Sequence, residues 1–82
     1  MTHSEYVAQQ LKINRTVRGW TQDELAERLE PKLGVRLSKQ SVSAWEHGIK
    51  QFTIDEVAAF ASLFKLPVSA WVLGGSTSGM AH

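Results

Sequence analysis

Four residues near the middle of the chain have the side chains needed to recognise the edges of DNA base pairs. Lysine donates to guanine O6 and N7, and glutamine bonds in bidentate fashion to adenine N6 and N7. Serine donates or accepts, and alanine contacts a thymine methyl group. On one outward helix face, such a set predicts a helix that enters the major groove, because its small members allow a close approach. The residues are Lys39, Gln40, Ser43 and Ala44.

The sequence contains no set of residues that is suited to catalysis or to metal binding. The chain has no cysteine, and its three histidines, His3, His47 and His82, are scattered. The sequence contains no His-Glu-x-x-His pair and no glycine-rich phosphate loop. The acidic residues between 23 and 30 are better explained as a solvated helix face. We therefore expect neither an enzyme nor a cofactor.

The charge distribution favours an anionic partner, but only weakly. The net charge is +1, whereas the segment 12–50 holds eight Lys or Arg against five acids, a net +3. The longest largely apolar run, 57–63 with Ser62 inside it, is too short to cross a bilayer. The first residues lack the basic and then apolar pattern of a signal peptide. We expect a cytoplasmic protein with no membrane contact.

The periodicity of apolar residues predicts an all-α domain of five helices and no strand. The expected helices span 4–18, a segment that begins at Thr21, 39–47, a segment capped by Thr53, and 68–73. Ser4 and Ser38 are expected N-caps. Thr21 and Thr53 each precede a glutamate by three residues, as in a capping box.

One buried core is expected beneath these helices. Val42 and Trp45 should face inward from the third helix, and Trp71 should join the core from the last one. An alternative for Trp71 is a contact between two copies in a dimer. We expect one domain over 1–75, and a flexible tail or linker over 76–82 that leads to a further domain or protein partner. The expected apolar stripe of the fourth helix is Ile54, Val57, Ala58, Ala61 and Phe64.

The second and third helices together have the form of a helix-turn-helix, and here the sequence resembles the Cro/repressor-type family, also called Xre-like. The resemblance covers about Val7 to Leu73 and implies a compact lambda-repressor-like domain. The residues that carry it are Leu11, Arg15, Gly19-Trp20-Thr21-Gln22, Glu24-Leu25-Ala26, and then Ser38, Gln40-Ser41-Val42-Ser43 and Trp45-Glu46-x-Gly48.

The resemblance also implies roles for single residues. The outward residues Lys39, Gln40, Ser43 and Ala44 would face the bases. Arg15 and Glu46 would form an internal ion pair between the first helix and the end of the third. Gln22 would also brace the third helix. The residues implied to lie at DNA phosphates are Thr21, Gln22, Ser41, His47 and Lys50.

The chain departs from the family in the turn between the two helices. The eight residues Glu30 to Leu37 separate Leu29 from Ser38, several more than in the shortest turns of the family. Either the turn is a longer loop or the second helix gains a turn, and the docking angle of the third helix depends on which occurs. Lys32 and Arg36 are candidates for added phosphate contacts.

The expected function is sequence-specific binding of double-stranded DNA by a transcriptional regulator, with repression favoured. A single recognition helix covers few base pairs, so we expect a homodimer on a pseudo-palindromic operator. The alternative is a protein-interaction module, such as an antitoxin or a bridging coactivator, because one fold serves several functions. The donor-rich face of the third helix favours DNA.

Overall fold

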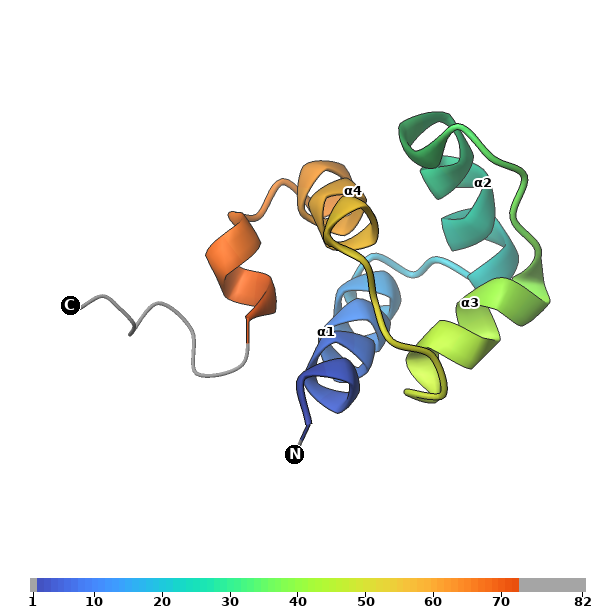
Figure 1. The fold of residues 1–82 in the computed structure, drawn as a ribbon. Helices are drawn as coiled ribbons and strands as arrows, with labels where there is room; N and C mark the ends of the chain where they lie inside the picture. The colour runs from blue at the N-terminus through green and yellow to red at the C-terminus, as the bar shows by residue number, and fades with distance from the viewer. Residues whose placement is uncertain (1, 73–82) are drawn as a thin grey trace, which may run out of the picture.

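Four α-helices and one short 3-10 helix make up the part of the chain that the computed structural model describes, residues 2–72. The α-helices are α1 (His3–Val17), α2 (Gln22–Leu33), α3 (Lys39–Glu46) and α4 (Ile54–Phe64), and the 3-10 helix is η1 (Val68–Trp71) (Figure 1). The all-α prediction is confirmed. The prediction of a fifth α-helix is wrong, because the described residues after Pro67, which end at residue 72, form a four-residue 3-10 helix. The predicted tail 76–82 and domain end at 75 lie outside the described residues.

The helix starts follow the capping residues, with one correction. Thr21 and Thr53 are N-caps with complete capping boxes, and Ser38 caps α3, as predicted. The prediction that Ser4 caps the first helix is wrong, since Thr2 is the N-cap. Glu5 lies three residues after Thr2 and completes a third capping box there, so the N-cap of α1 lies two residues earlier than expected.

The first half of the long turn is helical and extends α2. Helix α2 continues through Pro31 to Leu33 and ends at Gly34, whose φ of 72° places it in the left-handed region. A proline inside a helix removes one backbone hydrogen bond, so this last turn depends on packing. Leu29 is buried and Leu33 packs against the core. Only the short segment from Gly34 to Ser38 then separates α2 from α3.

The core is built from one face of every helix. Val42, Trp45 and Trp71 are almost completely buried, as predicted. A role for Trp71 as a dimer contact is excluded by its 0% exposure within a single chain. The predicted stripe on α4 is partly wrong, because Ile54 is 87% exposed and Ala58 is also exposed. The buried residues of α4 are Val57, Ala59, Phe60, Ala61 and Phe64.

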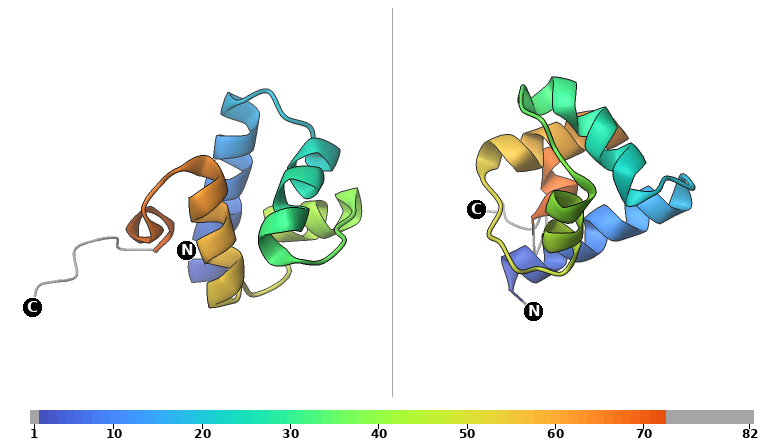
Figure 2. Two further views of the ribbon diagram at one scale, coloured as in Figure 1. Left: turned by 90° about the horizontal axis from the view of Figure 1, so that it is seen from above. Right: turned by 90° about the vertical axis from the view of Figure 1, so that its right-hand side faces the viewer.

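The arrangement of the helices leaves α3 at the edge of the molecule. In Figure 1 and in the left view of Figure 2, α1 and α4 lie between η1 on one side and α2 and α3 on the other. The hydroxyl of Tyr6 donates to the carbonyl of Ala70, and the His3 ring contacts the carbonyl of Trp71, so η1 is tied to α1. Among residues 2–72, no helix has the length and apolar character to span a membrane.

Candidate nucleic-acid interface

The rotation of α3 is set by the aromatic core beneath it. The Trp45 ring packs edge-on against Phe60, with centroids 5.4 Å apart, and lies 6.4 Å from Phe52. Val42, three residues earlier, is also fully buried. Because residues three apart lie on the same helix face, these two anchors turn the opposite face of α3 outward. This face is the one predicted to contact bases.

The predicted base-reading residues lie along that outward face. Lys39 and Gln40, in the first turn, are exposed, whereas Ser43 and Ala44, one turn later, are half-buried. The first turn of α3 contains no acidic residue, so no carboxylate of this turn would repel a phosphate. The two longest polar side chains therefore project furthest, beside small residues that allow a close approach to a groove.

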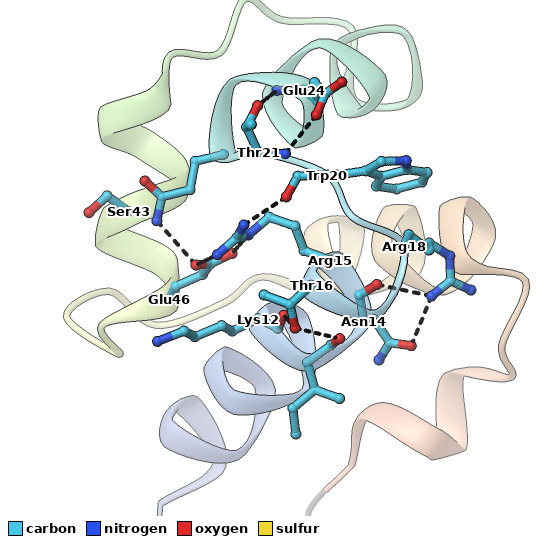
Figure 3. Close-up of polar contacts among 12 residues, drawn as sticks. Lys12, Asn14, Arg15, Thr16, Arg18, Trp20, Thr21, Glu24, Ser43 and Glu46 are labelled. Carbon is cyan, nitrogen blue, oxygen red and sulfur yellow. Dashed lines mark hydrogen bonds and ion pairs between the residues drawn. The ribbon is translucent and has the colours of Figure 1, made fainter.

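An ion pair joins α1 to the C-terminal end of α3. Arg15 Nε donates to Glu46 Oε2 over 2.6 Å, and a second guanidinium nitrogen donates to Glu46 Oε1 over 3.0 Å. The same guanidinium donates to the carbonyl of Trp20 over 2.8 Å (Figure 3). The exposed fractions of the two charged side chains are only 12% and 3%. This bidentate geometry is the strongest form of such a pair.

The pKa of Arg15 reflects these contacts. The hydrogen bond to Glu46 raises the pKa of the guanidinium above its ordinary value; burial opposes this rise, and the charge of Glu46 reinforces it. Arginine is protonated at any ordinary assay pH. The link between α1 and α3 therefore keeps its positive member under all conditions in which DNA binding is measured.

Gln22 adds a third element to this network, and its contact is of the kind that the resemblance implied, a brace on the third helix, although the partner residue was not predicted. Its side-chain nitrogen donates to Glu46 Oε1 over 3.1 Å, although the two residues are 24 positions apart. Glu46 thus accepts hydrogen bonds from α1 and from the first residue of α2. The end of the proposed recognition helix is held against both neighbouring helices through one carboxylate.

The N-terminus of α2, which is implied to meet a phosphate, lies beside this network. The Thr21 hydroxyl accepts the amide of Glu24, but its own hydrogen stays available for donation. The first amides of a helix have no partner within the helix and attract anions. Asp23 and Glu24 in the same turn weaken this attraction. Gln22 is half-buried, whereas Thr21 is exposed.

The three remaining predicted phosphate contacts are spread along α3 and the following loop. The half-buried Ser41 has its hydroxyl 3.4 Å from that of Ser38. The Nδ1 atom of His47 lies 2.7 Å from the carbonyl oxygen of Ser43. A carbonyl only accepts, so this nitrogen carries a proton and the ring is fixed against α3. The Lys50 ammonium lies 5.7 Å from the centroid of the Trp45 ring.

Lys32, one of the two candidates for an added phosphate contact, makes a hydrogen bond within the protein. Its ammonium donates to the Ser62 hydroxyl over 3.0 Å and so links the last turn of α2 to α4. Arg36, in the segment just before α3, is exposed. Of the two candidates in the long turn, only Arg36 is left without a hydrogen bond among the described residues.

Comparison with known proteins agrees with this arrangement. A family model described as Helix-turn-helix matches residues 11–71, which include all of α2, α3 and α4. The match spans well over half of the chain. No curated protein and no solved structure matches the chain significantly.

Proposed function

This chain belongs to the Xre/Cro-like family of DNA-binding helix-turn-helix proteins, and on that premise we propose that it is a cytoplasmic, sequence-specific transcriptional regulator that acts as a repressor. Helix α3 enters the major groove of double-stranded DNA. Lys39, Gln40, Ser43 and Ala44 contact base edges. Contacts to the phosphates come from Thr21, Gln22, Ser41, His47 and Lys50.

The observation that carries this proposal is the contrast between the two faces of α3. The inner face is fixed by buried Val42 and Trp45, and its C-terminal end by the contacts of Glu46 with α1 and α2. The outer face presents exposed Lys39 and Gln40. A rigid helix with free donors on one side favours base recognition. A mobile helix would lose conformational entropy on binding, and this loss would lower the affinity for DNA.

Two copies bind one operator in this proposal. A single α3 of eight residues reaches only a few base pairs, which gives little discrimination within a genome. A two-fold related pair repeats the contact one helical turn away, about 34–36 Å along the duplex. The operator is therefore a pseudo-palindrome. A footprint shorter than one helical turn, with one protein per duplex, would contradict the dimer.

Selection from a pool of random duplexes tests the proposed function. The purified protein is incubated with the pool at moderate salt, and bound duplexes are amplified and selected again. We expect enrichment of one sequence with inverted symmetry. Recovery of duplexes with no shared sequence, after several rounds, would contradict sequence-specific recognition.

Retention on heparin and on random duplex at low salt separates this proposal from a protein-interaction module. A DNA reader binds both, because phosphate contacts contribute to affinity for any duplex. A module that binds only proteins is retained by neither. The outward donors of α3 favour the first outcome.

A further inference from the structure

Glu30 holds both ends of the segment that leads from α2 into α3. Its backbone carbonyl accepts the amide of Gly34 over 2.7 Å. Its carboxylate atom Oε2 accepts the amide of Leu37 over 2.9 Å. Leu37 directly precedes Ser38, the N-cap of α3, and packs against the core. One residue of α2 therefore fixes the backbone at the point where the proposed recognition helix begins.

The other three α-helices obtain a similar bond from their own first turn. In each of them a glutamate at the third helical position accepts the amide of the N-cap residue, over 2.7 to 2.9 Å. In α3 this position is Ser41, and the helix has no complete capping box. The carboxylate that secures the start of α3 comes instead from α2, and it binds the amide one residue before the N-cap. The three glutamates are Glu5, Glu24 and Glu56.

The source of this carboxylate matters for a helix that approaches DNA. A glutamate at position 41 would place a negative charge in the first turn of α3, beside the predicted base and phosphate contacts. Like charges repel, and closely apposed ones oppose binding. Because Glu30 belongs to α2, the start of α3 is secured while its first turn keeps no acid.

Helix α2 by itself gains nothing from a glutamate at position 30. The residue is four positions before Gly34, near the helix C-terminus, where the helix dipole disfavours negative charge. Alanine also has the higher helix propensity. An isolated α2 would therefore be more stable with alanine at this position. A loss of stability on Glu30→Ala thus reports the bond to Leu37 rather than a property of α2.

We propose that Glu30 is a positioning residue for sequence readout: it fixes the entry of α3 and thereby the angle at which Lys39 and Gln40 meet the bases. The inference rests on the proposed function. It predicts that loss of the carboxylate impairs recognition of the preferred sequence, while binding to arbitrary DNA through phosphate contacts persists.

The test compares three variants of the full chain on two duplexes of equal length, one enriched by selection and one random. Glu30→Ala removes the acceptor, and Glu30→Gln keeps an oxygen that accepts the Leu37 amide. Glu27→Ala is the charge-matched control, because Glu27 is exposed on α2 and makes no hydrogen bond or ion pair within residues 2–72. Amide hydrogen exchange at Leu37 is measured in the free proteins.

We expect Glu30→Ala to lower affinity for the enriched duplex about tenfold, the scale of one lost charged hydrogen bond. Affinity for random duplex should stay within about twofold, and the midpoint of thermal unfolding should fall by about 4–8 °C. The Leu37 amide should exchange faster. Glu30→Gln should recover most of the preference, and Glu27→Ala should match the unmodified protein.

Two results would overturn the role of Glu30. One is a Leu37 amide that exchanges at the unmodified rate in Glu30→Ala. The other is an equal loss on enriched and random duplexes, which would indicate general destabilisation. An unmodified protein with no sequence preference would instead refute the proposed function, and Leu37 exchange would still show whether Glu30 secures the start of α3.

Discussion

Single residues at the proposed interface fall into two groups according to their contacts. Gln40 is exposed and points away from the core, so its amide is free to bond a base. Arg15 and Glu46 are largely buried and bond to one another, so they set the position of α3. Gln22 belongs to both groups, because it is predicted to meet a phosphate and also donates to Glu46.

Gln40→Ala and Gln22→Ala should separate base contact from phosphate contact. Gln40→Ala should leave folding intact and weaken binding to the enriched duplex by about 1–3 kcal/mol per half-site, the value of one bidentate base contact. Its affinity for random duplex should barely change. Gln22→Ala should lower affinity for both duplexes alike. Titrations of both variants on both duplexes provide the measurement, and an equal loss for Gln40→Ala would refute the assigned face.

Arg15→Ala should lower the stability of the domain more than its preference for one DNA sequence. It leaves Glu46, with 3% side-chain exposure, without its charged partner, and it removes the bond to the Trp20 carbonyl. Breaking a buried pair in this way costs about 3–5 kcal/mol, a large part of the stability of a small domain. Thermal unfolding measures the loss. Lys12→Ala, at an exposed position of the same helix, is the control, and equal midpoints for the two variants would show that the pair contributes little.

At the scale of whole elements, the starts of α2, α3 and α4 could be predicted because capping depends on residues three or four positions apart. The start of α1 is also encoded by Thr2 and Glu5, but Ser4 is equally acceptable as an N-cap by residue type, which explains the wrong prediction. The end of α2 could not be predicted, since Pro31 signals a break and only packing of Leu29 and Leu33 carries the helix past it.

The end of α2 offers a direct test of this packing argument. Gly34 has a φ of 72°, and a Cβ there would meet no atom within 4 Å, so the cost of a substitution is conformational. Gly34→Ala should lower the free energy of unfolding by about 1–2 kcal/mol. Gly34→Asn should cost less, because asparagine tolerates the left-handed region. Denaturant unfolding distinguishes them, and equal stability of all three proteins would mean that α2 ends elsewhere.

The candidate site was predictable only where it follows from local spacing. The outward position of Gln40 follows from the inward positions of Val42 and Trp45 on the same helix. The bonds from Gln22 to Glu46 and from Glu30 to Leu37 cross between elements and depend on how the helices pack. The extra turn of α2 decides that packing, and no periodicity reveals it.

At the scale of the whole molecule, the small positive bias limits how strongly DNA can be held by charge alone. The net charge is +1, and the excess of three positive charges lies within 12–50, the segment that includes α2 and α3. In the proposed function, discrimination between sequences therefore comes from the fit of α3 into the groove, which is consistent with the contacts that hold Glu46.

The salt dependence of binding should reflect this modest charge. We expect the logarithm of affinity to fall against the logarithm of salt concentration with a slope of roughly −4 to −8 per dimer, since each contacted phosphate contributes about −0.9. Titration of one duplex at several salt concentrations gives the slope. A flat response would be incompatible with phosphate contacts at Thr21, Gln22 and Lys50.

The central claim, that this protein distinguishes one DNA sequence from others, is tested most directly by the ratio of two affinities. The unmodified protein is titrated at one physiological salt concentration against the duplex enriched by selection and against a random duplex of the same length. The account predicts that the enriched duplex is bound at least about 10³-fold more tightly, as is typical of specific regulators. Equal affinity for the two duplexes would contradict it.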